Sequence, residues 1–448
     1  MHIQLSDHFT YRRLIRFTIP SIVMMIFTSI YSVVDGLFVS NFVGKAEFTA
    51  VNLIMPFTQI LGCIGFMFGT GGSALVSKTL GEGKPEKANR IFSLLTYAAL
   101  VSGVVLAVLG IALLEPIAIQ MGAVPEILPH CLTYGRILLV GLPAFMLQNL
   151  FQSFLVTAEK PHMGLAITVV AGVTNMVLDA LFIIGFHWGI AGAALATVLA
   201  QCVGGVVPFF YFFSHKNTSL LHLGKTAWDG RAMLQACTNG SSELVSNISM
   251  SIVGMLYNYQ LMKFDPENGV AAYGVVMYVG FVFIAIFLGY AIGVAPVIGY
   301  HYGAANKVEL TGLFRKSLVI VVSSGVVLSV LAFAGARPLA MIFAGYDEAL
   351  LSLTITAMRY YALTVTCAGI SIFGSSFFTA LNDGLTSALI SFLRTLVFQV
   401  SMVLILPIFF QLNGVWYSQC ATEFMAMCLT VVFFVALRKK YGYAGERK

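Results

Sequence analysis

The sequence predicts an all-α polytopic membrane protein with twelve transmembrane helices in two six-helix bundles related by a pseudo-twofold axis. Composition is the first observation behind this fold class: hydrophobic residues make up 58% of the 448-residue chain and charged residues 10%, against about 45–50% and about 25% in soluble domains. The second is that apolar runs of about 20 residues, enough to cross a bilayer, recur along the whole chain. The third is a weak repeat between its two halves.

Each apolar run is expected to be a helix, because lipid offers no hydrogen-bond partner to an open backbone. Short polar connections separate the runs. We expect spans at residues 14–39, 48–77, 91–114, 132–157, 162–186, 188–213, 233–262, 271–300, 317–344, 356–380, 385–410 and 413–437.

The Lys and Arg residues between the spans predict the orientation. Of the 25 in the chain, 19 fall on the side that holds both termini, five fall on the other side, and Arg394 lies within a span. Cytoplasmic loops carry the excess of Lys and Arg, so we expect both termini in the cytoplasm and the chain in the cell membrane. The basic residues are scattered over short loops, and we therefore expect no nucleic-acid partner.

The repeat predicts the domain organisation. A shift of 222 positions places Gly71 on Gly293 and Gly81 on Gly303, and other matches share this register. Since six spans return the chain to the same side, the halves should be parallel repeats about an axis along the membrane normal, with a cleft between them. The predicted parts are an N-terminal lobe (1–213), a cytoplasmic linker (214–232), a C-terminal lobe (233–437) and a basic cytoplasmic tail (438–448).

Four carboxylates lie inside the predicted spans: Asp35, Asp179, Glu243 and Glu423. An acid at bilayer depth costs about 2.5–3.5 kcal/mol on insertion scales, so such residues usually face a cavity, a partner or an ion path. Two fall in each half of the sequence. The pattern favours a protein that moves a solute across the membrane and couples this movement to a cation.

In the first half, the polar groups are spaced so that they converge. Asn175 and Asp179 are four residues apart and share a helix face, and Thr197 follows on the next span after a short Gly-rich turn at 186–192. Together with Asp35 they supply two carboxylates, an amide and a hydroxyl, which suit a hard cation such as Na⁺. The two acids could instead share a proton. The alternative is a buried network that only fixes helix packing.

The second half offers two further pairs. Glu243 and Asn247 also lie four residues apart, and no basic residue lies at the depth of Glu243. This acid is therefore a candidate for binding a cation or a cationic substrate, or for a structural hydrogen bond. Arg394 and Glu423 both lie deep in neighbouring spans, and we expect them to form a structural ion pair because either charge alone would be expensive.

Pro20 lies in the first span, fifteen residues before Asp35. Proline removes a backbone hydrogen bond inside a helix. We expect the first span to bend at this residue when the charge state of Asp35 changes.

The chain resembles the multidrug and toxic compound extrusion (MATE) family over essentially its whole length, and is most similar to the bacterial MepA-like branch. The resemblance rests on Pro20, the segment Tyr31-Ser32-Val33-Val34-Asp35, the loop Gly81-Glu82-Gly83-Lys84, Asn175-x-x-x-Asp179, Thr197 and Glu243. It implies a cation-coupled exporter of organic, often cationic compounds. It also implies a first-lobe H⁺ or Na⁺ site at Asp35, Asn175, Asp179 and Thr197, and a cation or drug site in the second lobe at Glu243. Some relatives carry an acid in the tenth helix, whereas residues 360–380 here contain none.

The functional prediction is a secondary active transporter that exports lipophilic or cationic organic compounds by alternating access, in exchange for H⁺ or Na⁺. We expect a monomer among membrane lipids, with no cofactor besides the coupling ion. The chain has no HExxH, GxSxG or Walker A motif, so we expect no enzymatic activity and no ATP site. The alternatives are a flippase for a lipid-linked precursor, whose anionic substrate calls for a basic cavity, and a channel, which would favour a ring of charges.

Overall fold

The structure is a computed structural model that describes residues 3–266, 268–345 and 347–443. Within these residues the chain is helical and contains no strand. The helices are α1 (Tyr11–Phe42), α2 (Lys45–Gly81), α3 (Pro85–Gln120), α4 (Leu128–Val140), α5 (Leu142–Thr157), α6 (Pro161–Asp179), α7 (Gly189–Phe213), α8 (Gly230–Phe264), α9 (Asn268–Gly303), α10 (Lys307–Ala334), α11 (Ala336–Ala344), α12 (Glu348–Ala380), α13 (Gly384–Phe392) and α14 (Gln399–Tyr441), with the π-helical turns η1 (Ala180–Gly185) and η2 (Leu393–Phe398).

The helices provide twelve membrane spans. Among the described residues nine helical stretches are long and apolar enough to cross a bilayer, and the bent pair α4 and α5 makes ten. One of the nine, Gly384–Tyr441, has 58 residues, which at 1.5 Å per residue is about 87 Å and far exceeds one bilayer. It turns back at Gln411, where φ is 49°, and therefore counts as two spans. The twelfth is α8, which is 35 residues long but too polar for the apolar set.

Three details differ from the sequence-based expectation. The span predicted at 132–157 consists of α4 and α5, which bend by 53° at Gly141, because Pro143 starts α5 and cannot donate a backbone bond to the turn before it. The span predicted at 317–344 begins earlier, at Lys307, and breaks at Gly335. The turn predicted at 186–192 is shorter, because α7 already begins at Gly189.

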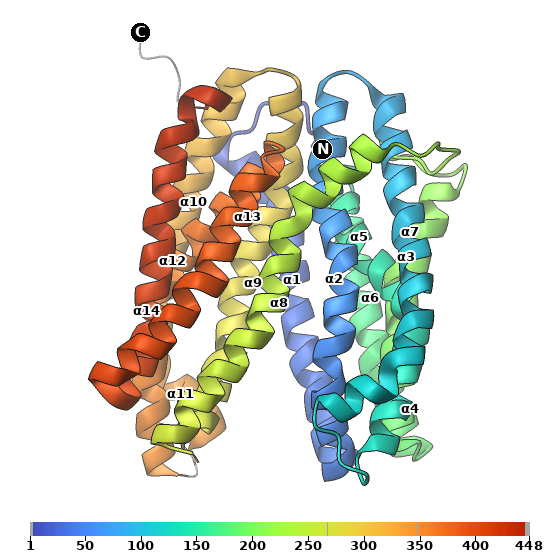
Figure 1. Cartoon of the computed structure of the whole chain (residues 1–448). Coiled ribbons are helices and arrows are strands. Elements are labelled where there is room, and N and C mark those ends of the chain that lie inside the picture. The colour runs from blue at the N-terminus through green and yellow to red at the C-terminus, as the bar shows by residue number, and fades with distance from the viewer. Residues whose placement is uncertain (1–2, 267, 346, 444–448) are drawn as a thin grey trace.

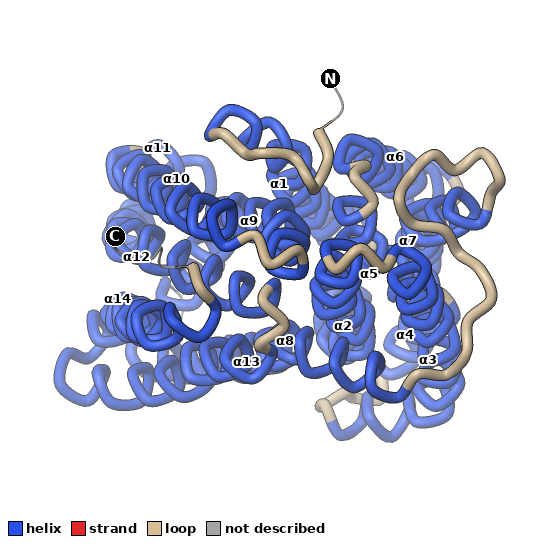
Figure 2. The backbone as a smooth tube through the Cα atoms, turned by 90° about the horizontal axis from the view of Figure 1, so that it is seen from above, coloured by secondary structure: helices blue, strands red, loops and turns tan. Residues whose placement is uncertain are grey.

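The helices form two bundles side by side (Figure 1). Viewed along the spans, α2 to α7 lie on one side and α8 to α14 on the other, and α1 stands beside both α6 and α9 (Figure 2). The stretch 214–229 joins the bundles outside the spans, and α8 begins at Gly230 because the Asp229 carboxylate caps it through Arg231 N and Ala232 N at 3.1 Å each. The helix α14 extends into the predicted tail as far as Tyr441. Residues 444–448 of this tail lie outside the described residues.

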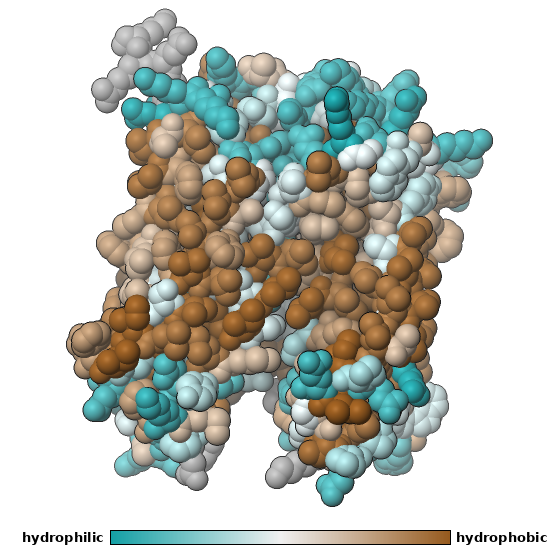
Figure 3. Space-filling model, in the orientation of Figure 1, coloured by the Kyte–Doolittle hydropathy of each residue, from teal (hydrophilic) through white to brown (hydrophobic). Residues whose placement is uncertain are grey.

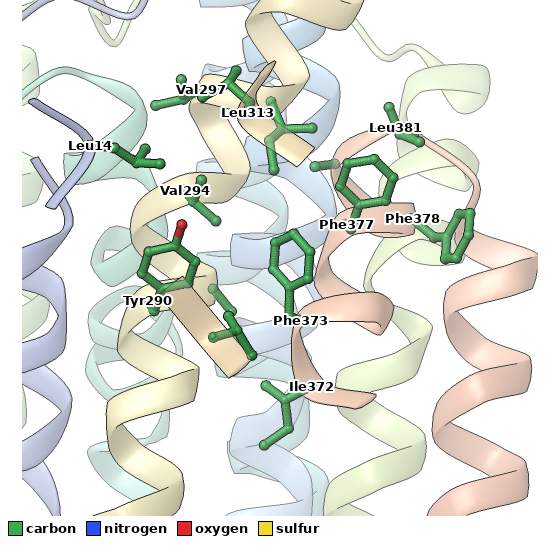
Figure 4. Packing of buried hydrophobic residues seen from close by; sticks show 14 of the residues in the cluster. Leu14, Tyr290, Val294, Val297, Leu313, Ile372, Phe373, Phe377, Phe378 and Leu381 are labelled. Carbon is green, nitrogen blue, oxygen red and sulfur yellow. The ribbon is translucent and has the colours of Figure 1, made fainter. Parts of the chain in front are cut away.

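A large core lies where the two bundles meet near the termini. It joins Leu14 and Phe17 of α1 to residues of α9, α10 and α12. In Figure 4, Leu14 lies near Val294 of α9, while Phe373 and Phe377 pack from α12. On the face shown in Figure 3, an apolar band lies between two polar ends. The core therefore fastens the bundles together at one end of the spans.

Candidate functional site

Asp35, Asn175 and Asp179 meet inside the N-terminal bundle. Asp35 lies in α1, and Asn175 and Asp179 lie one turn apart at the end of α6, directly before η1. Asp179 is fully buried, Asn175 is 2% exposed, and Asp35 is half-buried with one oxygen enclosed. The Asp35 carboxyl lies within reach of both other side chains. The structure therefore brings together three of the four residues predicted for the first-lobe site.

These three side chains lie close together, but several of their polar atoms lack hydrogen bonds. Asp35 Oδ1, both Asp179 carboxylate oxygens and Asn175 Nδ2 have no hydrogen-bond partner in the described part of the chain. No Lys, Arg or His of the described residues pairs with either acid. Buried polar atoms are normally hydrogen-bonded. This arrangement suits a cation or a proton that arrives from outside.

Thr197 is not joined to the cluster by a hydrogen bond among the described residues. Its hydroxyl donates to the Ala193 carbonyl at 3.0 Å within α7. Two tyrosines beyond the predicted set lie near the acids. Tyr31 lies one turn before Asp35 and next to Gln148 of α5, and Tyr134 of α4 lies near both Asp35 and Asp179. Helical spacing from Asp35 could have indicated Tyr31, but nothing local in the sequence indicates Tyr134.

In the C-terminal bundle, Glu243 faces the N-terminal bundle. It is half-buried on α8, with Cys63 of α2 nearby. Asn247 donates to the Glu243 backbone carbonyl at 2.8 Å, so this bond leaves the carboxylate uninvolved. The described residues contain no group of three or more His, Cys, Asp or Glu side chains arranged to hold a metal ion.

Arg394 and Glu423 form the ion pair predicted from their depth. Arg394 Nη2 lies 2.8 Å from Glu423 Oε1, and Arg394 Nε donates to both carboxylate oxygens at 3.2 and 3.0 Å. The pair joins η2 to the second half of α14. It neutralises both charges inside the bundle.

The bundles are closed at the end that carries the termini and separate at the other end. Gly71 of α2 packs against Gly240 of α8, and Gly293 of α9 packs against Thr18 of α1. Pro20 lies next to this contact, because the following residues Ser21 and Ile22 pack against Gly289. At the opposite end, Figure 3 shows a hollow between the bundles.

The N-terminal segment, residues 3–10, spans both bundles at the closed end. Leu5 N donates to Glu159 Oε1, in the loop before α6, at 2.6 Å. Phe9 N donates to Glu309 Oε1 of α10 at 2.9 Å, and His8 Nδ1 lies 2.6 Å from Glu309 Oε2. Lys316 Nζ donates to the Phe9 carbonyl at 2.5 Å. We call this segment the N-terminal strap.

Comparison with known proteins gives the family. The MatE family model matches the chain twice, at residues 20–181 and 244–405. The multidrug export protein MepA of Staphylococcus haemolyticus (strain JCSC1435) is 24% identical over 432 residues, which cover 96% of this chain and 94% of that protein. MepA of Staphylococcus aureus (strain MRSA252) is 21% identical over 431 residues, with the same coverage of 96% and 94%.

Solved structures share the fold. A MATE crystal structure in complex with MaL6 has a TM-score of 0.90 and 23% identity, covering 98% of both chains. A multidrug resistance MATE family transporter of the MOP superfamily, in an outward-facing conformation, has a TM-score of 0.90 and 22% identity, covering 98% of this chain and 97% of that one. The two matches of the family model span most of the sequence, and the chain belongs to the MatE family of transporters. It is a multi-pass membrane protein.

Proposed function

We propose that this protein is a secondary active exporter of lipophilic, cationic organic compounds, driven by exchange with H⁺ or Na⁺. The observation that carries the proposal is the cluster of Asp35, Asp179 and Asn175, whose buried oxygens lack partners in the described residues. The multidrug export function printed for the MepA relatives supports the substrate class. The chain performs no chemistry on its substrate in this proposal.

The transport cycle alternates access to the cleft. The excess of Lys and Arg near the termini favours a cytoplasmic position for that end of the molecule. In this orientation, the closed contacts near the termini and the hollow at the opposite end support an outward-open arrangement. A cation or proton taken up at Asp35 and Asp179 removes the repulsion between two buried negative charges. This favours a different packing of α1 against α6. Pro20 is the proposed bending point, because it lies between this site and the closed end.

Thr197 is the proposed fourth member of the ion site, because its hydroxyl oxygen keeps lone pairs for a cation while its hydrogen is donated to the Ala193 carbonyl. Glu243 is the proposed contact for a cationic substrate or a second cation, since it is an acid at the surface between the bundles. Asn247 then stabilises the α8 backbone beside Glu243 through its hydrogen bond to the Glu243 carbonyl. The protein is proposed to act as a monomer.

Efflux from proteoliposomes under separately imposed Na⁺ and pH gradients tests the coupling. With a fluorescent lipophilic cation such as ethidium as substrate, we expect Asp35→Asn and Asp179→Asn each to abolish gradient-driven export while the protein still inserts. Glu126→Gln changes an exposed acid outside the cluster and should export normally. Wild-type export by both Asn variants would falsify the assignment of the coupling site.

A flippase for an anionic lipid-linked precursor is the second candidate. A solved MOP superfamily transporter from Pyrococcus furiosus, for which reversed polarity of the binding pocket suggests a different function, has a TM-score of 0.88 to this chain. Fold alone therefore does not decide the substrate. Charge favours the exporter, because Arg394, the one basic residue found deep in the predicted spans, is already paired with Glu423.

A further inference from the structure

Glu423 is almost completely enclosed by its arginine partner. The two side chains are 17% exposed for Arg394 and 4% exposed for Glu423. Arg394 Nε and Nη2 together make three hydrogen bonds to the carboxylate, which occupy both of its oxygens. One guanidinium group therefore provides the positive charge that a bound cation would provide.

A network of polar side chains adjoins the pair. Gln419 Nε2 lies 3.4 Å from Glu423 Oε1, and Gln399 donates to Gln419. Tyr257 accepts from Gln399 Nε2 at 3.1 Å and shares a hydrogen bond of 2.8 Å with Ser418. Polar side chains from α8 and from both halves of α14 therefore form one hydrogen-bonded network that ends on a buried carboxylate.

The repeat relates this place to the coupling cluster of the other bundle. With a slightly larger shift of 225 positions, Ala421-Thr422 aligns with Ala196-Thr197, so Glu423 directly follows the counterpart of Thr197. Arg394 lies on the fifth span of its bundle, as Asn175 and Asp179 do in theirs. Both fifth spans contain a π-helical turn, η1 directly after Asp179 and η2 around Arg394. The acids of one bundle thus have no basic partner among the described residues, whereas the acid of the other is paired with an arginine of its own chain.

We propose that the Arg394 guanidinium is a tethered substitute for a bound cation, which permanently fills a cation site at Glu423. The C-terminal bundle then takes up no ion at this place. This step rests on the proposed function: the coupling ion is then exchanged only at Asp35 and Asp179. Removal of the guanidinium is expected to expose a cation site that the native protein does not offer.

The test uses purified full-length protein with Asp35→Asn and Asp179→Asn, so that the N-terminal cluster does not contribute. On this background, Arg394→Met leaves Glu423 without its partner. We expect its melting temperature to rise by at least about 2 °C when Na⁺ replaces choline at constant ionic strength, or on acidification, because a ligand that binds the folded state stabilises it. The other titratable side chains near Glu423 are Tyr257, Tyr361, Cys367 and Cys420, and they are the same in every variant compared.

Two matched variants separate this result from a general loss of stability. Arg394→Lys keeps a tethered cation, and Arg394→Met with Glu423→Gln removes both charges, so neither should gain the response. An equal response in Arg394→Met and in the double variant would overturn the proposal. If Arg394→Met does not fold, binding of radioactive Na⁺ to the background protein decides. We expect Glu423→Gln to leave the amount of bound Na⁺ unchanged, because Arg394 already fills the site. A loss of Na⁺ binding in Glu423→Gln, with Arg394 intact, would also overturn the proposal. These outcomes do not depend on whether export is coupled at Asp35.

Discussion

Gly81 of α2 and Gly303 of α9 make the same contact from opposite sides of the surface between the bundles. Gly81 packs on the carbonyl of Tyr300, and Gly303 packs on the carbonyl of Lys78. Tyr300 follows Lys78 by 222 positions, and Gly303 follows Gly81 by the same number. The repeat of the sequence is thus also a reciprocal contact in space, and it lies at the closed end of the molecule.

Alanine at either glycine is expected to open this contact. A Cβ on Gly81 or Gly303 would overlap a backbone carbonyl oxygen of the facing helix, which cannot rotate away as a side chain can. We expect Gly81→Ala and Gly303→Ala to shift the protein away from the form that is closed at the termini. Cysteines placed near the closed end should then react faster with a water-soluble maleimide.

Gly254→Ala is the control for this experiment. Gly254 lies within α8, and no atom lies within 4 Å of a Cβ added there. Its reactivity pattern should match that of the native protein. Unchanged labelling in both Gly81→Ala and Gly303→Ala would show that close packing of these helices does not hold the closed end.

The N-terminal strap is expected to depend on Glu309. This carboxylate binds the Phe9 backbone and the His8 ring, and it is 8% exposed. Glu309→Ala removes both bonds, so the strap should leave the surface between the bundles. A cysteine at Leu5, which is fully buried in the native form, should change from protected to reactive.

Glu309→Gln serves as the intermediate variant in the same labelling experiment. Its amide oxygen can still accept from Phe9 N but lacks the charge that attracts His8 and Lys316. We expect partial protection of the cysteine at Leu5. Full protection in Glu309→Ala would mean that the apolar contacts of Leu5 and Phe9 hold the strap without this acid.

Asp383 gives a prediction for pH dependence outside the spans. Burial alone raises the pKa of Asp383, but hydrogen bonds from Tyr441 and Thr386, with Lys440 nearby, hold it below the usual value of 3.8. A pKa that is lower in the folded than in the unfolded chain adds stability above the unfolded value, and this stability is lost as the pH falls through the folded pKa. We expect Asp383→Asn to lower the free energy of unfolding by about 1–3 kcal/mol at neutral pH.

The difference between Asp383→Asn and the native protein should shrink as the pH falls below about 4, where the native carboxylate also becomes neutral. Thermal unfolding across a pH series measures this. Asp347→Asn is the control, because Asp347 only caps α12 through Ala349 N and Leu350 N, and asparagine caps a helix equally well. A constant difference at all pH values would assign the effect of Asp383 to packing.

The spans and the Arg394–Glu423 pair could be predicted from sequence because both follow from the energetics of lipid. A charge deep in a span is so unfavourable that two opposite charges at one depth predict each other. The meeting of Asp35 with Asp179 also followed from depth and helical spacing. In these cases one strong free-energy term decides the outcome, and this term can be read from residue type and position.

Other features depend on contacts between distant segments and were not predictable. The strap joins residues about 300 positions apart, and no local pattern near His8 indicates Glu309. Tyr134 of α4 lies near Asp35 of α1 and Asp179 of α6, and no sequence pattern shows how these three helices pack together. The Thr197 hydroxyl donates to a backbone carbonyl within α7, and residue spacing alone does not reveal such a local hydrogen bond.

The strap also constrains how the protein is made. Phe9 is synthesised early, yet its partners Glu309 and Lys316 leave the ribosome about 300 residues later. The leading segment must therefore wait undocked during insertion of most of the chain, and it completes the packing only when α10 is in place. A bulky fusion at the amino terminus would interfere with this docking step.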